Sequence, residues 1–93
     1  MTVTRHLTIH GRVQGVGYRY AMVAVASRLG VTGWVRNRRD GTVEAVVQGS
    51  PDTVEEITNW AHQGPAASLV SQVEISESAE QKNYTDFTQQ PTL

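Results

Sequence analysis

Two short segments carry residue types that could do chemistry, and the first is Val13–Arg19, which reads VQGVGYR. It joins an alternating apolar segment to an amphipathic one, so it should lead from a strand into the N-terminus of a helix. Unpaired N–H groups gather at such a terminus, and the helix dipole favours negative charge there. Glycines at 15 and 17 would let these N–H groups turn toward one anion, and the guanidinium of Arg19 suits phosphate oxygens.

The segment therefore predicts a cradle for one small phosphate group. No Gly-Lys-Ser/Thr sequence follows it, so the lysine and the magnesium-binding hydroxyl of a nucleotide P-loop are missing. The alternative is that the two glycines only make a tight strand-to-helix turn, with Arg19 in solvent.

The second segment is Gly33–Asn37, which reads GWVRN and is followed by Asp40-Gly41. Asparagine is disfavoured within strands, yet Asn37 stands at the end of a segment with strand character. Its side-chain amide could hold a water through one donor and one acceptor. The alternative is a strand-end asparagine that enters a turn, because Asp40-Gly41 is a strong hairpin signal.

Length and composition exclude several classes of protein. The 93 residues are enough for one core, and we expect residues 1–93 to form a single domain. The absence of cysteine excludes disulfides, thiolate catalysis and zinc sites with sulfur ligands. The histidines are scattered at positions 6, 10 and 62, so we expect no metal site. No apolar run reaches the roughly 20 residues that span a bilayer, and no signal peptide is evident, so we expect a cytoplasmic protein without membrane contact.

The charges divide along the chain. Residues 1–39 contain seven arginines and no acid, whereas the remainder holds all nine carboxylates and Lys82. Such a split can mark a nucleic-acid surface. Because the net charge is only −1, we expect instead that the acidic half folds against the basic half and that nucleic acid is not a partner.

Hydrophobic periodicity predicts an α+β domain. Alternation or strand composition predicts strands around Leu7–Val13, Thr32–Arg38, Thr42–Gln48 and Leu69–Ser76. Helical spacing predicts a first helix over Tyr18–Leu29. A second helix should begin at Ser50-Pro51 and end at Gly64-Pro65. Gly30 stands where a left-handed C-terminal cap would lie, and the tail from Tyr84 can add a short fifth strand. This order is that of a ferredoxin-like split βαββαβ sandwich, with two helices on one face of an antiparallel sheet.

Taken together, GRVQGVGYR at residues 11–19 and GWVRNRRDGTVEAVVQG at residues 33–49 strongly resemble the signature segments of the acylphosphatase family. The resemblance runs from about His6 to Pro65, and the family's fold is the ferredoxin-like one that the periodicity predicts. What the resemblance implies for the site is a phosphate-binding loop, an essential arginine and an asparagine that positions the attacking water. Carried over position by position, the loop corresponds to Gln14, Gly15, Val16, Gly17 and Tyr18. The essential arginine corresponds to Arg19, and the asparagine that positions the water corresponds to Asn37.

The resemblance implies hydrolysis of a small-molecule acyl phosphate to a carboxylate and inorganic phosphate. No metal, cofactor or covalent enzyme intermediate is expected, and inorganic phosphate should act both as product and as competitor. An acyl phosphate has a good leaving group, so the protein mainly has to position reactants and stabilise charge. The phosphate's own oxygens could take the proton of the water. We expect a monomer, and these segments do not identify the physiological acyl group.

Two other interpretations stay open. The acylphosphatase-like module of hydrogenase-maturation proteins is similar, although it is part of a much longer protein. A non-catalytic ferredoxin-like module that binds an anion or RNA is the alternative from a different class. RNA binding would need stacking aromatics on the central strands, and Leu7–His10 and Val43–Val46 contain none.

The C-terminal third departs from the family pattern. Family members tend to carry an arginine after the Gly-Pro that ends the second helix, where this chain has Ala66 and Ala67. Pro91 cannot donate a hydrogen bond to a strand ladder, so the last strand should be short. These differences leave both signature segments intact.

Overall fold

The computed structural model describes residues 1–79 and 82–93. Within them, the elements follow the predicted order. They are β1 (Val3–Arg12), α1 (Tyr18–Leu29), β2 (Thr32–Asn37), β3 (Val43–Gly49), α2 (Pro51–Ala61), β4 (Leu69–Glu77) and β5 (Phe87–Gln89). The fifth strand has three residues, as expected for a tail that contains Pro91.

The strands form one sheet in the order β4-β1-β3-β2-β5. The first four strands pair antiparallel, as predicted, whereas β5 pairs parallel to β2 and makes the sheet mixed. The reason lies in the path of the chain. β4 ends where Glu77 pairs with Arg5, at the same end of the sheet where β2 begins. A strand that starts after crossing the sheet at this end must run alongside β2 in the same direction.

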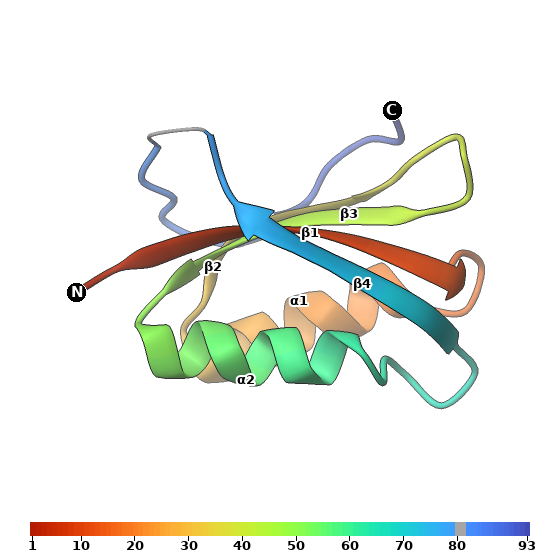
Figure 1. Ribbon diagram of the computed structural model, residues 1–93, viewed down its shortest axis with the longest axis horizontal. Helices are drawn as coiled ribbons and strands as arrows, with labels where there is room; N and C mark the ends of the chain where they lie inside the picture. The colour runs from red at the N-terminus through yellow and green to blue at the C-terminus, as the bar shows by residue number, and fades with distance from the viewer. Residues whose placement is uncertain (80–81) are drawn as a thin grey trace.

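Both helices cover one face of the sheet, and the other face is open (Figure 1). The predicted caps are present. Gly30 ends α1 in the left-handed conformation with φ of 73°, and the Ser50 side chain accepts a hydrogen bond from the backbone N–H of Thr53 at the start of α2. In residues 1–79 and 82–93, neither helix is long and apolar enough to cross a membrane.

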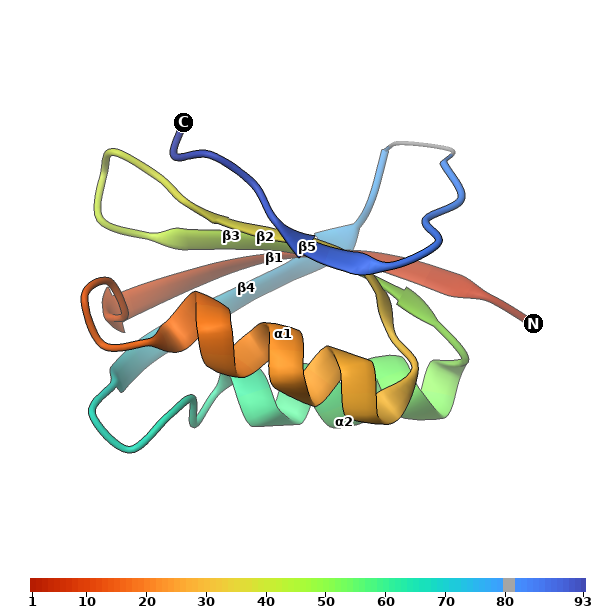
Figure 2. The ribbon, with the colours of Figure 1, turned by 180° about the vertical axis from the view of Figure 1, so that it is seen from behind.

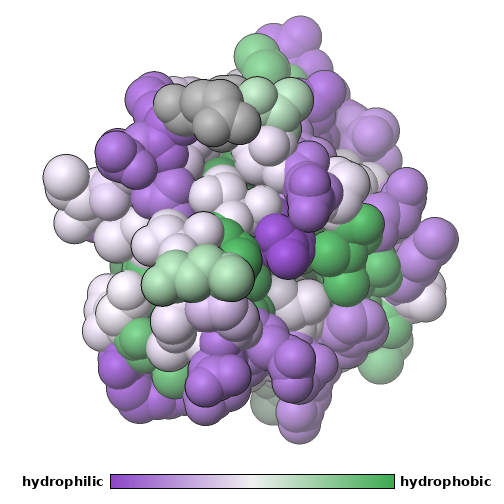
Figure 3. Space-filling view, turned by 60° about the vertical axis from the view of Figure 1, so that its left-hand side comes forward, coloured by the Kyte–Doolittle hydropathy of each residue, from purple (hydrophilic) through white to green (hydrophobic). Residues whose placement is uncertain are grey.

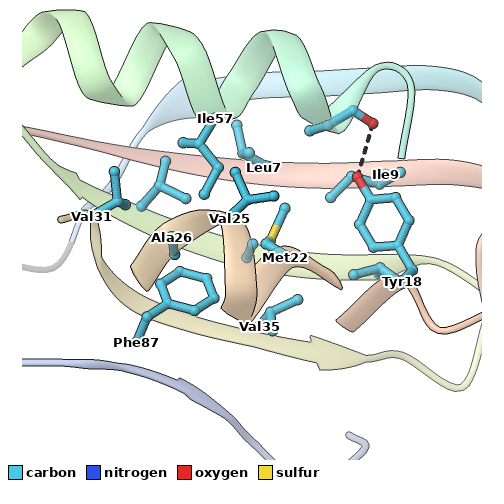
Figure 4. Packing of buried hydrophobic residues seen from close by; sticks show 14 of the residues in the cluster. Leu7, Ile9, Tyr18, Met22, Val25, Ala26, Val31, Val35, Ile57 and Phe87 are labelled. Carbon is cyan, nitrogen blue, oxygen red and sulfur yellow. Dashed lines mark hydrogen bonds between the residues drawn. The ribbon is translucent and has the colours of Figure 1, made fainter. Parts of the chain in front are cut away.

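The core lies between the sheet and the two helices (Figure 4). Leu7 and Ile9 from β1 point toward the helices because side chains alternate along a strand, and they meet Met22 of α1 and Ile57 of α2. All four side chains are fully buried. Burial of such a side chain stabilises the fold by about 1.5–3 kcal/mol. The core thereby fixes the two elements, β1 and α1, that the phosphate-loop segment connects.

Candidate active site

The segment between β1 and α1 lies at the same end of the molecule as the β2–β3 hairpin (Figure 2). Gly15 and Gly17 both have left-handed backbones, with φ of 73° and 79°. A Cβ added to either glycine would meet no atom within 4 Å. Glycine is therefore required here for its backbone conformation and not for space.

The N-terminus of α1 presents unused donors. Gly17 is the N-cap, no side chain caps the helix, and the first turn contains no acidic residue. The first helical hydrogen bond runs from the N–H of Ala21 to the carbonyl oxygen of Gly17 at 3.0 Å. In the part of the chain that the structure describes, no group accepts a hydrogen bond from the backbone N–H groups of residues 15–20. With the half-buried Arg19 on the same turn, this terminus can bind an anion.

Asn37 is the last residue of β2, at the hairpin end of the sheet. It shares its strand face with Val35, which is fully buried beneath the helices. Among residues 1–79 and 82–93, the Oδ1 of Asn37 is the one buried side-chain polar atom without a hydrogen-bond partner. An unsatisfied buried acceptor costs about 1–3 kcal/mol. Such a cost is typical of a group held ready for a ligand or a water.

Gln14 connects the loop to this hairpin. Its Nε2 amide donates to the carbonyl oxygens of Arg38 at 2.7 Å and Thr42 at 2.9 Å. The sequence predicted Gln14 as part of the loop but gave no sign of this link, because the partners are backbone carbonyls. Residues 14–19 and Asn37, which are distant in sequence, are thus brought to one end of the sheet.

The side chain of Tyr18 points toward α2. Its ring packs against Trp60 with centroids 5.4 Å apart. Its hydroxyl donates to the carbonyl oxygen of Ala61 at 2.8 Å, the hydrogen bond drawn as a dashed line in Figure 4. Burial raises the pKa of the Tyr18 hydroxyl well above its usual value. Tyr18 was predicted as part of the phosphate-binding loop. Because its hydroxyl is engaged with Ala61, only its backbone N–H is left to bind a phosphate.

Glu44 organises the charges on the open face of the sheet. Its carboxylate accepts hydrogen bonds from Arg36 at 2.7 Å and Arg38 at 3.3 Å, and it contacts the ring of His6 at 2.6 Å. Burial works to raise the pKa of Glu44, but hydrogen bonds from His6 and Arg36 outweigh it, and the pKa is lowered. Neither signature segment nor the periodicity singled out Glu44. The predicted β2–β3 hairpin could have indicated Glu44, because the register of the two strands puts it directly opposite Arg36.

Two clefts in the described residues lie away from this end. One, of about 530 Å³, is lined by Thr4, Arg5 and Gln48 among others, at the opposite end of the strands. That side of the molecule is mostly polar, with hydrophobic side chains in small separate patches (Figure 3). The other, of about 300 Å³, lies beside Trp34 and Arg36. Neither of these two clefts is lined by Arg19 or Asn37.

Comparison with known proteins identifies the family of this chain. The family model described as acylphosphatase matches residues 5–89. The chain belongs to the acylphosphatase family. The curated acylphosphatase of Acidovorax sp. (strain JS42) is 57% identical over 76 residues, which are 82% of this chain and 78% of the relative. These relatives are named for a hydrolase, so the family identifies this chain as an acyl phosphate hydrolase and does not favour a non-catalytic module.

Solved structures agree with this assignment. An acylphosphatase from Coxiella burnetii superposes with a TM-score of 0.90 at 36% identity, covering 96% of this chain and 93% of that one. Full-length HypF, in a phosphate- and nucleotide-bound form, contains a similar region with a TM-score of 0.89 and 26% identity, which covers 99% of this chain but 12% of HypF. The predicted fold and family are therefore both confirmed.

Proposed function

We propose that the chain hydrolyses acyl phosphates with the phosphate held by the backbone N–H groups of the 14–19 loop and by Arg19. The observation that supports the proposal is that complementary groups lie at one end of the sheet. Backbone N–H donors without a partner and the Arg19 guanidinium lie at the start of α1, and Asn37 at the end of β2 has a buried amide oxygen without a partner.

The phosphate would be bound before any bond changes. The helix terminus and the Arg19 guanidinium both favour negative charge, so they would stabilise the charged phosphoryl oxygens while the bond to the leaving group breaks. Donors fixed in advance need no reorganisation at that moment. The tyrosine hydroxyl of Tyr18 takes no part, because it is engaged with Ala61.

Asn37 would direct the attacking water. Its Oδ1 can accept one hydrogen of the water, which turns a lone pair of the water oxygen toward phosphorus. The water oxygen then forms a bond to phosphorus while the bond from phosphorus to the acyl oxygen breaks, and the carboxylate departs with the electron pair. A phosphate oxygen takes the proton of the water, so no side-chain base is required.

We further propose that the protein is cytoplasmic and acts on a small-molecule substrate as a monomer, since one chain supplies all the groups that the mechanism uses. Size-exclusion chromatography of the active protein tests the oligomeric state. A dimer that loses activity on dilution would contradict it.

The function itself is tested with acetyl phosphate in a buffer that contains a metal chelator. We expect rapid release of acetate and inorganic phosphate, competitive inhibition by added phosphate, and negligible rates on an alkyl phosphate. The poorer leaving group of the alkyl ester would need an acid catalyst, which the proposed site does not supply. Activity that disappears with the chelator and returns with magnesium or zinc would contradict the mechanism, and equal rates on the alkyl phosphate would contradict the reaction class.

A further inference from the structure

We propose that Gln14 is a positioning residue, whose side chain holds the phosphate loop in register with Asn37 and does not itself bind the phosphate. This inference rests on the proposed function, since it concerns the alignment of the bound phosphate with the water that Asn37 directs. Its basis is the pair of hydrogen bonds from the Nε2 amide of Gln14 to the carbonyl oxygens of Arg38 and Thr42.

The donors of the Gln14 side chain are fully used. A primary amide has two N–H hydrogens, and its two partners here, at 2.7 and 2.9 Å, are carbonyls that can only accept. The amide must therefore present its nitrogen to the hairpin. No side-chain N–H of Gln14 is left for a phosphate oxygen.

The hairpin offers Gln14 a rigid target. The Arg38 carbonyl also accepts from the N–H of Gly41 at 3.1 Å, and the Thr42 carbonyl accepts from the N–H of Arg38 at 2.8 Å. The Asp40 carboxylate closes the turn by accepting hydrogen bonds from the backbone N–H of Thr42 at 3.0 Å and from its hydroxyl at 2.7 Å. Asn37 directly precedes this turn, so a group fixed to the turn is fixed relative to Asn37.

The loop side needs such a link. Val13 and Tyr18 are buried and anchor the two ends of the loop, but Gly15 and Gly17 between them have wide backbone freedom. Gln14 is the loop residue tied by its side chain to the hairpin. Without this tie, the N–H groups could still gather around a phosphate, but the phosphorus atom would be displaced from the path of the water. A misplacement of about 1 Å can cost on the order of 10²-fold in rate.

The direct test is Gln14→Met, which keeps the length and neutrality of the side chain and removes both donors. The hairpin keeps its own hydrogen bonds to the two carbonyls, so the variant should fold. We expect kcat for acetyl phosphate to fall roughly 10- to 100-fold. The inhibition constant of inorganic phosphate should change little, because Gln14→Met removes none of the loop N–H groups and leaves Arg19 in place at the start of α1.

Gln48→Met is the matched control. The Nε2 amide of Gln48 also donates to two partners, the Thr4 hydroxyl at 3.0 Å and the Lys82 carbonyl at 2.7 Å, but at the opposite end of the strands. This variant should lower the melting temperature and leave kcat and KM unchanged. An equal loss of kcat in Gln48→Met would show that the effect is one of general stability, and it would overturn the proposal.

A second variant, Gln14→Glu, keeps the shape of the side chain. Its ability to donate a hydrogen bond depends on pH, because only the protonated acid has an O–H. The ionised carboxylate can donate nothing and faces two carbonyls, which disfavour its charge. It should take up a proton at or above the ordinary glutamate pKa of about 4.3. Its activity relative to wild type at the same pH should rise as the solution is acidified through this range, because the protonated acid regains one donor. A ratio that stays constant with pH would count against the hydrogen bonds to the hairpin.

Two results in Gln14→Met would overturn the proposal. Unchanged kcat would mean that the link to the hairpin does not matter for turnover. A phosphate inhibition constant that rises in step with the loss of kcat would make Gln14 a phosphate-binding group. Failure of the proposed function looks different, because wild-type protein would then not hydrolyse acetyl phosphate at all, and the role of Gln14 would fall with it.

Discussion

The residues at the site differ in what they contribute. Gly15 and Gly17 adopt left-handed backbones, and Gln14 links the loop to the β2–β3 hairpin. In the proposed mechanism, Arg19 would bind the phosphate and Asn37 would direct the water. The two signature segments predicted this set through their joint resemblance to the acylphosphatase family, whereas each segment taken alone left a plain turn as an alternative. The roles of Gln14 and Tyr18 were beyond the sequence, since hydrogen bonds to the carbonyls of Arg38, Thr42 and Ala61 leave no pattern in the side chains.

At this scale, Arg19→Gln should lower kcat and weaken inhibition by inorganic phosphate together. Loss of one preorganised charge-stabilising donor typically costs about 10²–10³ in rate, or ~2.7–4 kcal/mol. Steady-state kinetics with acetyl phosphate, with and without added phosphate, measures both effects. Circular dichroism should show a native spectrum, because Arg19 is only half-buried. If the folded variant binds phosphate normally, the segment VQGVGYR is only a turn.

At the scale of elements, substitutions at two glycines with positive φ can distinguish the cost of backbone strain from the cost of a steric clash. Gly17 has open space around it, whereas a Cβ on Gly33 would come within 1.9 Å of the Val46 carbonyl oxygen in the neighbouring strand β3. Gly17→Ala should therefore lower the free energy of unfolding by about 1–2 kcal/mol through left-handed strain. Gly33→Ala should cost more, because β2 and β3 must separate. Urea denaturation of both variants checks the order, and equal losses would contradict it.

The elements also show where periodicity stops being informative. The ten residues of β1 and the twelve of α1 are long enough for their hydrophobic periodicity to distinguish a strand from a helix. Ser50-Pro51 marks the start of α2. The three residues of β5 are too few to alternate, and their direction follows from where the chain crosses the sheet after β4. The parallel pairing of β5 with β2 was therefore beyond sequence reasoning.

At the scale of the whole molecule, the split charge of the sequence is partly resolved by folding. Glu44, from the acidic part of the chain, pairs with Arg36 and Arg38 from the basic part, and Arg36 also stacks on Trp34 with 4.6 Å between the guanidinium carbon and the ring centroid. The expected contact between the two halves is present at this cluster. Arg19 is not among its members, and its charge stays available for an anion.

This cluster makes a prediction about acid stability. The pKa of Glu44 is lower in the folded protein than in the unfolded chain, so its contribution to stability is present above the unfolded pKa of about 4.3 and is lost as the pH falls through the folded value. Glu44→Gln should thus be less stable than wild type at neutral pH. The difference in unfolding free energy should shrink on acidification below about pH 4. Urea titrations at several pH values measure this difference, and a constant gap would mean that Glu44 is not stabilised as an anion.

The central claim is that one residue directs the water while others hold the phosphate, and Asn37→Ala tests it most directly. The variant removes the unpaired Oδ1 and leaves the loop and Arg19 intact. The measurement is kcat for acetyl phosphate together with the inhibition constant of inorganic phosphate, on protein shown to be folded by circular dichroism. We expect kcat to fall on the order of 10²-fold or more, with the phosphate constant close to that of wild type. A folded Asn37→Ala protein with near-normal turnover would contradict the account.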